Sequence, residues 1–246
     1  MKIHLEADYK SSTAFYPIYS FAGQLISVEL VTHFSHTTAN VAIPQDMLLP
    51  QLDNEQRVLL LQKQINSIEK HQDFFCQHNV KATLNIDATL AETILKSEFL
   101  ARKMESIEWL ALEINERFPD LSLGRENPSL LALSERFDLS LENYGAGRSS
   151  SKAIYDNLFF RIKLDKGFIQ RNLNRLSFKP FISTVLEHIK PHCEQVIVQG
   201  IDNVSGLKKV SRFDFDGIQS PLFSPVGEDS LSTLIDPPEG FAELLH

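Results

Sequence analysis

Carboxylate, amide and ammonium side chains recur near the ends of the short apolar runs in this sequence. The set comprises Glu29, Asn85, Glu113, Glu142, Asn143, Lys163, Gln199 and Gln219. Carboxylate and amide oxygens are the ligands that a hard divalent cation prefers. A lysine among them could neutralise a phosphate or orient a water molecule. The residue types therefore fit a divalent-cation site, provided that the fold gathers them. Otherwise they are strand-end polar residues that meet water.

Other kinds of active site find less support in the sequence. The eight histidines show no HxH or HExxH spacing, so a zinc site is not expected. Gly145 and Gly147 lack the Lys-Ser/Thr ending of a phosphate-binding loop, and we expect them to serve a backbone turn. Cys76 and Cys193 form no CxxC pair and are expected to be reduced, buried thiols.

A series of strands that alternates with helices must position these side chains. Residues 15–18 and 25–34 predict the two arms of a β-hairpin around Gly23. Further strands are predicted at 80–86, 108–114, 137–142, 159–164, 195–201 and 213–219. Asp53 and Gln56 form a capping pair at the start of a predicted helix over 53–78. Other helices are predicted at 90–105, 128–135, from 151, 177–188 and 203–209.

This alternation predicts an α/β fold with a parallel sheet. Seven such units in about 220 residues fit a closed barrel better than an open sheet, with the active site at the carboxyl ends of the strands. No repeat or low-complexity linker divides the chain, so residues 1–246 are expected to form one domain. The last segment, 227–246, carries Pro237, Pro238 and several acidic residues and is expected to be a tail that packs on the surface or is mobile.

Composition limits the class of function. The 246-residue chain has 24 Lys and Arg against 32 Asp and Glu, a formal net charge of −8, and 43% hydrophobic residues. Such a composition is typical of a soluble globular protein, and its acidity argues against direct binding to duplex DNA. The charged N-terminal segment does not resemble a signal peptide, and no apolar run is long enough to span a membrane. We expect a cytoplasmic protein without membrane association.

Seven segments in a fixed order resemble the successive motifs of one family. They are SVELVTHF, TLNID, LEINE, ENYGAGRSS, RIKLDKGFI, VIVQGIDN and FDGIQSPLFSP, and the resemblance extends over a motif core of about residues 15–226. These motifs resemble those of the EAL-domain family, the phosphodiesterases that open cyclic di-GMP. The resemblance implies a TIM-like (β/α)8 barrel with one antiparallel strand. It also implies a site in which two Mg²⁺ or Mn²⁺ ions clamp the attacking water and the phosphodiester.

Several functional positions of the family are retained. Glu29 matches the glutamate of the signature, and Asn85 and Glu113 match the next two ligands. Lys163 matches the family lysine, and Gln219 matches the glutamine of the last motif. The resemblance thus identifies these residues as remnants of a catalytic site, in which we expect Lys163 to pair with the carboxylates as an internal ion pair.

Three departures weaken the chemistry of that site. Glu142 and Asn143 stand where the family has two aspartates. The first change moves a carboxylate by about 1.5 Å, and the second replaces an anionic ligand with a neutral amide. Gln199 stands where the family has a glutamate, and an amide is neither an anion nor a proton acceptor at neutral pH. We therefore expect no catalytic residues, at most weak binding of Mg²⁺ or Mn²⁺, and no useful hydrolysis.

The nucleotide-binding positions of the family have changed as well. Tyr16 replaces the usual glutamine of the first strand, and His33 replaces an arginine that could grip a phosphate. Asp202 replaces a nearby glutamate. Together with Gln219 these are vestigial nucleotide-binding positions. Tight binding of cyclic di-GMP is not expected, and weak binding stays open.

The whole chain, including parts outside the catalytic motifs such as MKIHLE, resembles the YdiV-type subgroup of degenerate EAL proteins; FYPI and NYGAGRSSSKAIYD are further shared stretches. This resemblance implies a negative regulator of flagellar gene expression and motility that is not an enzyme. It would bind the FlhD subunit of the transcription activator FlhDC and block its DNA binding. The alternatives are a weak cyclic di-GMP phosphodiesterase and a cyclic di-GMP receptor without turnover. The sequence does not identify the residues that contact the partner.

Overall fold

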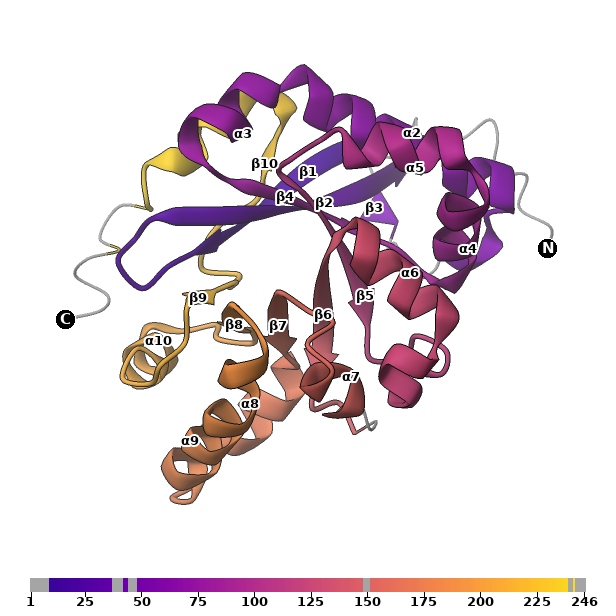
Figure 1. Cartoon of the computed structure of the whole chain (residues 1–246). Coiled ribbons are helices and arrows are strands. Elements are labelled where there is room, and N and C mark those ends of the chain that lie inside the picture. The colour runs from indigo at the N-terminus through magenta and orange to yellow at the C-terminus, as the bar shows by residue number, and fades with distance from the viewer. Residues whose placement is uncertain (1–8, 37–41, 44–47, 148–150, 239–240, 242–246) are drawn as a thin grey trace.

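The computed structural model describes residues 9–36, 42–43, 48–147, 151–238 and 241, and its central feature is a closed barrel of eight strands (Figure 1). The barrel strands are β1 (Tyr9–Tyr19), β2 (Leu25–His36), β4 (Lys81–Asn85), β5 (Leu110–Asn115), β6 (Asp138–Tyr144), β7 (Arg161–Leu164), β8 (Gln195–Val198) and β9 (Gly217–Ile218). Two short strands extend it, because β3 (Ala42–Ile43) pairs with β2 and β10 (Val226–Gly227) pairs with β1. The barrel closes because β1 pairs with both β2 and β9.

One strand of the barrel runs against the others. β1 is antiparallel to β2 and to β9, whereas each neighbouring pair from β2 round to β9 is parallel. The β1–β2 turn contains Gly23 with a φ of +82°, a backbone conformation that glycine adopts without the steric cost of a side chain. The predicted α/β barrel with one antiparallel strand is therefore confirmed.

Helices cover the outside of the barrel (Figure 1). They are α2 (Asn54–Lys70), α3 (Gln72–His78), α4 (Ala88–Lys96), α5 (Glu98–Glu105), α6 (Pro128–Arg136), α7 (Ser151–Tyr155), α8 (Lys166–Asn172), α9 (Phe178–Ile189) and α10 (Val204–Val210). Short 3-10 helices are η1 (Leu49–Gln51), η2 (Leu121–Glu126), η3 (Lys190–His192) and η4 (Glu228–Ile235). In Figure 1, α8, α9 and α10 lie at the lower left, opposite α4 and α5 at the upper right. No helix among the described residues is long and apolar enough to cross a membrane.

Two predicted helices are each divided in two. The predicted capping pair is present, since Asp53 Oδ1 accepts from the backbone N–H of Gln56 at 2.8 Å. The helix nevertheless ends at Lys70, and α3 starts after His71 instead of continuing the same helix. The helix predicted over 90–105 breaks at Ser97, whose hydroxyl accepts from the backbone N–H of Leu100 and caps α5. Serine favours such a cap over a helix interior, so the uninterrupted helices were wrong.

The last predicted strand is shorter than expected. Of residues 213–219, only Gly217 and Ile218 pair with their neighbours. The segment after the barrel packs on it: η4 buries Leu231 and Leu234, and the Tyr19 hydroxyl donates to the Leu234 carbonyl at 2.9 Å. Part of the predicted tail is therefore a layer against β1.

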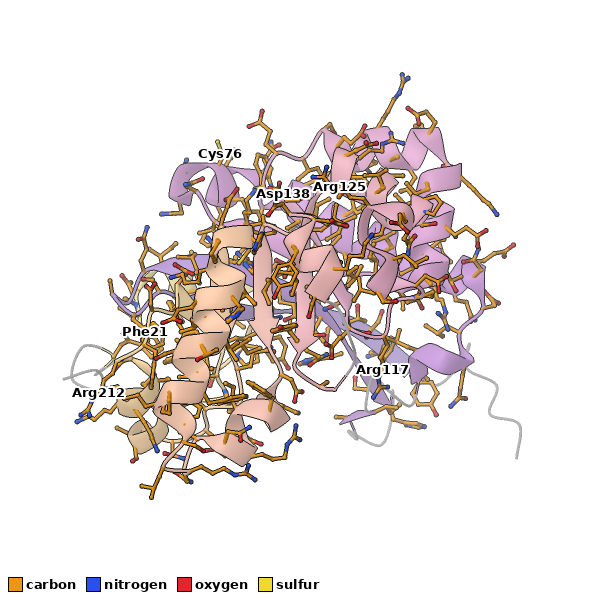
Figure 2. All side chains as sticks on the ribbon, turned by 60° about the horizontal axis from the view of Figure 1, so that its bottom comes forward. Phe21, Cys76, Arg117, Arg125, Asp138 and Arg212 are labelled. Carbon is orange, nitrogen blue, oxygen red and sulfur yellow. The ribbon has the colours of Figure 1, made fainter. Side chains whose placement is uncertain are left out.

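The expectation of two buried cysteines was wrong for one of them. Cys76 is exposed on the outer side of α3 (Figure 2), whereas Cys193 is half-buried. Successive helix residues point about 100° apart, and Phe75 takes the buried face of α3. Burial raises the pKa of the Cys193 thiol to about 12, which disfavours the reactive thiolate at neutral pH.

Candidate functional site

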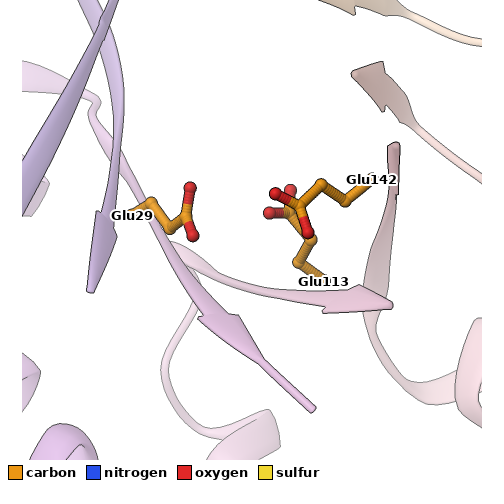
Figure 3. A group of neighbouring side chains, drawn as sticks. All are labelled: Glu29, Glu113 and Glu142. Carbon is orange, nitrogen blue, oxygen red and sulfur yellow. The ribbon is translucent and has the colours of Figure 1, made fainter. Parts of the chain in front are cut away.

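Three carboxylates meet at the carboxyl ends of the barrel strands. Glu29 comes from β2, Glu113 from β5 and Glu142 from β6, and each offers one oxygen within 4.8 Å of the others. Figure 3 shows Glu113 and Glu142 side by side, with Glu29 facing them across the mouth. Side chains alternate along a strand, so alternate residues of these strands point into the barrel. This geometry explains why residues so far apart in sequence form one cluster.

The ammonium group of Lys163 occupies the centre of this cluster. Lys163 is fully buried on β7, and its Nζ lies 2.8 Å from Glu29 Oε2 and 2.7 Å from Glu113 Oε1. The distance to Glu142 Oε1 is 4.0 Å. Lys163 is thus the internal ion-pair partner that the sequence predicted, and it bridges two carboxylates at once.

Amide groups occupy the remaining positions around Glu29. The Asn85 amide donates to Glu29 Oε1 at 2.6 Å, and the Gln219 amide donates to Glu29 Oε2 at 2.9 Å. Gln199 in turn donates to the side-chain oxygen of Gln219 at 2.8 Å. Both oxygens of Glu29 therefore accept hydrogen bonds. Gln199 belongs to the same network, but it contributes a neutral amide and no charge.

The other two carboxylates have fewer partners. Glu113 accepts a hydrogen bond from the Ser140 hydroxyl at 2.7 Å in addition to the one from Lys163. Glu142 accepts from its neighbour Asn143 at 3.0 Å. Asn143 has a φ of +61°, so the chain turns sharply at the end of β6. Asn143 therefore bonds to Glu142, and the structure shows no bond from it to the rest of the cluster.

Burial and neighbouring charges shift the pKa values of the clustered groups in different directions. Burial pushes the pKa of Glu29 up, but the charge and hydrogen bond of Lys163, with the two amides, outweigh it and hold the pKa below its ordinary value. Burial raises the pKa of Glu113, and Lys163 offsets this only in part. Burial raises the pKa of Glu142 to about 7 against the opposing charge of Lys163. Burial alone would lower the pKa of Lys163, yet the three carboxylates raise it.

A second buried cation, Arg161, was not among the residues predicted from the sequence. It lies on β7 two residues before Lys163, fully buried, and donates to Ser27 at 2.9 Å and to Gln195 at 2.9 Å. Its guanidinium lies 4.8 Å from the centre of the Phe160 ring, and burial lowers its pKa to about 10. Residues two apart on a strand share a face. The spacing of Arg161 and Lys163 was therefore the available signal.

The residues expected at nucleotide-binding positions are only partly gathered. The Tyr16 hydroxyl and His33 Nε2 lie 2.9 Å apart on adjacent strands, so these two side chains bond to each other. Burial, and then the charge of Glu29, raise the pKa of Tyr16. Asp202 is exposed after β8, where it accepts from Asn203 at 2.7 Å, and it does not join the carboxylate cluster.

Two cavities flank Glu29 at the mouth. One, of about 370 Å³, is lined by α2 and the end of β4 and includes Arg57 and Asn85. The Arg57 guanidinium pairs with Asp87 and donates to the Leu49 carbonyl, so it is already bonded. The other, of about 570 Å³, includes Tyr16, Lys166, Gln199 and Asp202. Both volumes are in the range of small-ligand sites.

Comparisons with known proteins agree with the barrel and with the predicted family. The model of the EAL domain matches residues 5–225. A protein of Escherichia coli strain K12, named putative anti-FlhC(2)FlhD(4) factor YdiV, is 38% identical over 235 residues, which cover 96% of this chain and 99% of that protein. The anti-FlhC(2)FlhD(4) factor YdiV of Salmonella typhimurium strain LT2 is 32% identical over 231 residues, covering 94% of this chain and 98% of that protein.

Solved structures give the same result. The crystal structure of the EAL-like domain protein YdiV superposes with a TM-score of 0.87 at 38% identity, covering 95% of this chain and all of that one. The PaMucR phosphodiesterase in complex with c-di-GMP gives a TM-score of 0.73 at 17% identity, covering 90% of this chain and 94% of that one. The second likeness concerns the fold alone.

Proposed function

The chain belongs to the EAL domain family, and we propose that within it this protein is a regulator rather than an enzyme. It binds the FlhD subunit of the FlhDC transcription activator, prevents that complex from binding DNA and so lowers flagellar gene expression. The observation that carries the proposal is the 38% identity, over 96% of this chain, to a protein named as an anti-FlhC(2)FlhD(4) factor. This function requires a cytoplasmic protein, because its partner acts on DNA.

The donor set at the barrel mouth supports the absence of metal-dependent hydrolysis. Two divalent cations would need several oxygen ligands each, at fixed distances. The cluster offers three carboxylates, and the Lys163 ammonium lies within 2.8 Å of two of them. Both oxygens of Glu29 already accept hydrogen bonds from N–H donors. These residues do not fit a pair of Mg²⁺ or Mn²⁺ ions.

The position of Gln199 supports the same conclusion about proton transfer. A general base must accept a proton from the attacking water, and a glutamine amide cannot do so at neutral pH. The Gln199 amide donates to Gln219 and is thereby held within the network. Glu142, whose Oε2 accepts a hydrogen bond from Asn143, is the carboxylate that remains as a candidate base.

A second candidate function rests on the cavities. Together they leave room for a small ligand on either side of Glu29. A receptor that binds cyclic di-GMP without turnover would use this space. Of the residues expected to hold the nucleotide, Tyr16 and His33 bond to each other and Asp202 bonds to Asn203, which argues for weak binding at most.

The test of the proposed function is co-elution of the purified protein with purified FlhDC in size-exclusion chromatography, followed by an electrophoretic assay of FlhDC on promoter DNA. We expect a stable complex and loss of the DNA-bound band without added nucleotide. Absence of a complex at about 50 µM of each protein contradicts the proposal. Linear product from cyclic di-GMP and Mn²⁺ would instead establish the phosphodiesterase.

A further inference from the structure

The outer surface formed by α8, α9 and α10 has a charge opposite to that of the whole chain. Residues 161–212 contain ten Lys and Arg against four Asp and Glu, whereas the chain carries 24 against 32. Two of the ten, Arg161 and Lys163, are buried in the barrel. The others lie on the helices and their connections, at the lower left of Figure 1. This acidic protein therefore presents a basic surface over these helices.

Several cations of this surface lack an ion-pair partner. Arg175, Lys179 and Lys208 are exposed, and no carboxylate among the described residues forms a salt bridge with them. Arg212, just after α10, points away from the ribbon in Figure 2 and is likewise unpaired within the described part of the chain.

On the opposite side of the barrel, the basic side chains form salt bridges with neighbouring carboxylates. Lys96 pairs with Glu92 at 2.6 Å, and Arg102 pairs with Glu98 at 2.8 Å. Lys103 pairs with Glu69 at 3.1 Å. Basic side chains are therefore neutralised locally on α4 and α5, whereas Arg175, Lys179 and Lys208 have no salt bridge to any described carboxylate.

Apolar side chains lie among the unpaired cations. Leu176, in the turn between α8 and α9, is fully exposed, and Phe181 on α9 is 41% exposed. The Phe181 ring packs against Phe168 of α8 at 5.3 Å between centroids. Single exposed apolar residues are ordinary. Here two of them lie within the same short stretch as Arg175 and Lys179, in the combination of apolar and basic groups that protein interfaces use as anchors.

The surface is held rigidly by the barrel beneath it. α9 buries Phe178, Ile182, Leu186 and Ile189, so its main apolar face points inward. Lys209 of α10 donates to the Leu173 carbonyl and lies 5.7 Å from the centre of the Phe178 ring, which ties the three helices together. A preformed surface of this kind binds without a large ordering cost.

We infer that this surface is where the protein docks its partner, and that it fits an acidic protein surface with an apolar recess. The α8–α10 surface is defined by Arg171, Arg175, Leu176, Lys179, Phe181 and Lys208. The inference rests on the proposed function, and opposite charge on the partner gives complementarity. A nucleic acid would offer phosphates but nothing for Leu176 and Phe181. An anionic bilayer would need a continuous outward apolar face, which α9 turns toward the barrel.

The test compares two matched triple variants for binding to FlhDC by calorimetric titration. The first carries Arg175→Glu, Leu176→Ser and Lys179→Glu on the α8–α10 surface. The second carries Lys96→Glu, Phe99→Ser and Arg102→Glu on α4 and α5, where Phe99 is 82% exposed. Each variant reverses two charges and removes one exposed apolar side chain, so global charge effects are equal. Circular dichroism and thermal unfolding establish that both variants fold.

We expect the α8–α10 variant to bind at least about 30-fold more weakly, whereas the α4–α5 variant binds within about three-fold of wild type. Equal binding by both variants overturns the inference and leaves the proposed function in place. Absence of binding by the wild type overturns the proposed function and the inference with it. Pelleting of the wild type with vesicles of phosphatidylglycerol, lost only in the α8–α10 variant while FlhDC binding is kept, assigns the surface to a membrane and also overturns the inference.

Discussion

The mouth of the barrel and the α8–α10 surface both concentrate charge, but the mouth pairs its cation Lys163 with carboxylates, whereas the outer surface leaves several of its cations unpaired within the described residues. In the mouth, Lys163 lies 2.8 Å from Glu29 and 2.7 Å from Glu113, and amides of Asn85 and Gln219 donate to the two oxygens of Glu29. On the outside, Arg175 and Lys179 are exposed and unpaired among the described residues. A buried charge must be paired to avoid a large desolvation cost, whereas an exposed one needs no partner.

The two regions therefore differ in which of their groups are available to a ligand or partner. Groups in the mouth already bond to one another, so a metal or nucleotide would first have to break those bonds. The unpaired groups on α8–α10 can contact a partner without first breaking a bond within the protein. In this account the ancestral site has become part of the barrel's internal structure, and binding takes place on the outer helices.

The largest expected effect is on stability, from removal of the central cation. Lys163→Met leaves Glu29 and Glu113 buried without their shared partner, and loss of one member of a buried ion pair costs about 3–5 kcal/mol. We expect a fall of that size in the free energy of unfolding, measured by urea denaturation at pH 7. Lys179→Met on the outer surface should change it by no more than about 0.5 kcal/mol. If both substitutions lowered the free energy of unfolding by a similar amount, the charges of the mouth would be no more important for stability than those of the outer surface.

The pH dependence of stability provides a second test of the mouth. The pKa of Glu142 is raised to about 7 in the fold, above its ordinary value near 4.5, so the fold favours the protonated form. The stabilisation is present below about pH 4.5 and is lost as the pH rises through 7. Between pH 5 and 8 this group should cost on the order of 1–3 kcal/mol. The lowered pKa of Glu29 has the opposite sign but acts below this window, whereas the raised pKa of Glu113 has the same sign as that of Glu142 and leaves part of the slope in place.

Glu142→Gln should therefore flatten the stability profile and make the protein more stable at pH 8. Urea denaturation at pH 5, 6.5 and 8 measures the profile, and Glu187→Gln on α9 serves as the matched exposed control. A wild-type slope retained in Glu142→Gln would show that this carboxyl does not titrate as described.

Added salt should have a smaller effect, and it should weaken partner binding at the α8–α10 surface more than it changes the stability that the mouth provides. Exposed charges are screened strongly, whereas buried pairs are screened much less. Raising NaCl from about 0.1 to about 0.5 M is expected to weaken FlhDC binding about ten-fold and to leave the free energy of unfolding nearly unchanged. Calorimetric titration and urea denaturation give the two values. Salt-independent binding would mean that the α8–α10 cations do not contribute.

The smallest expected effect is that of metal on the wild-type protein. About 1 mM Mn²⁺ should shift the melting temperature by less than about 1 °C, because the proposed regulator does not use a paired-metal site. The combined variant Glu142→Asp, Asn143→Asp and Gln199→Glu restores the family's acidic positions and should gain about 2–4 °C under the same conditions. An equal gain in wild type would show that the mouth still binds metal. No gain in the variant would show that these positions were wrongly assigned.

The sequence was sufficient to predict the barrel and most of the cluster. The regular alternation of apolar strands and amphipathic helices leaves few topologies, and ligand positions at strand ends converge once the barrel closes. Glu29, Glu113 and Lys163 therefore meet as expected. The pairing of Tyr16 with His33 could not be foreseen, because it depends on the register of β1 against β2.

Local breaks and single side chains were harder to predict. Periodicity continues through His71 and Ser97, so it did not reveal that the helices end there. The exposure of Cys76 follows from which residue of α3 faces the core, and the composition of that helix does not specify it. Arg161 lies within the motif RIKLDKGFI but has no counterpart among the predicted site residues, although its spacing from Lys163 places both inside the barrel.

The most direct test of the account is whether partner binding needs anything in the barrel mouth. FlhDC is titrated calorimetrically with the protein in EDTA without nucleotide, and again with Mg²⁺ and cyclic di-GMP. The account predicts dissociation constants that agree within about two-fold, since the groups of the mouth bond to one another and the partner docks outside. Binding that appears only with metal and nucleotide would contradict it, because the mouth would then be a working ligand site that controls the partner.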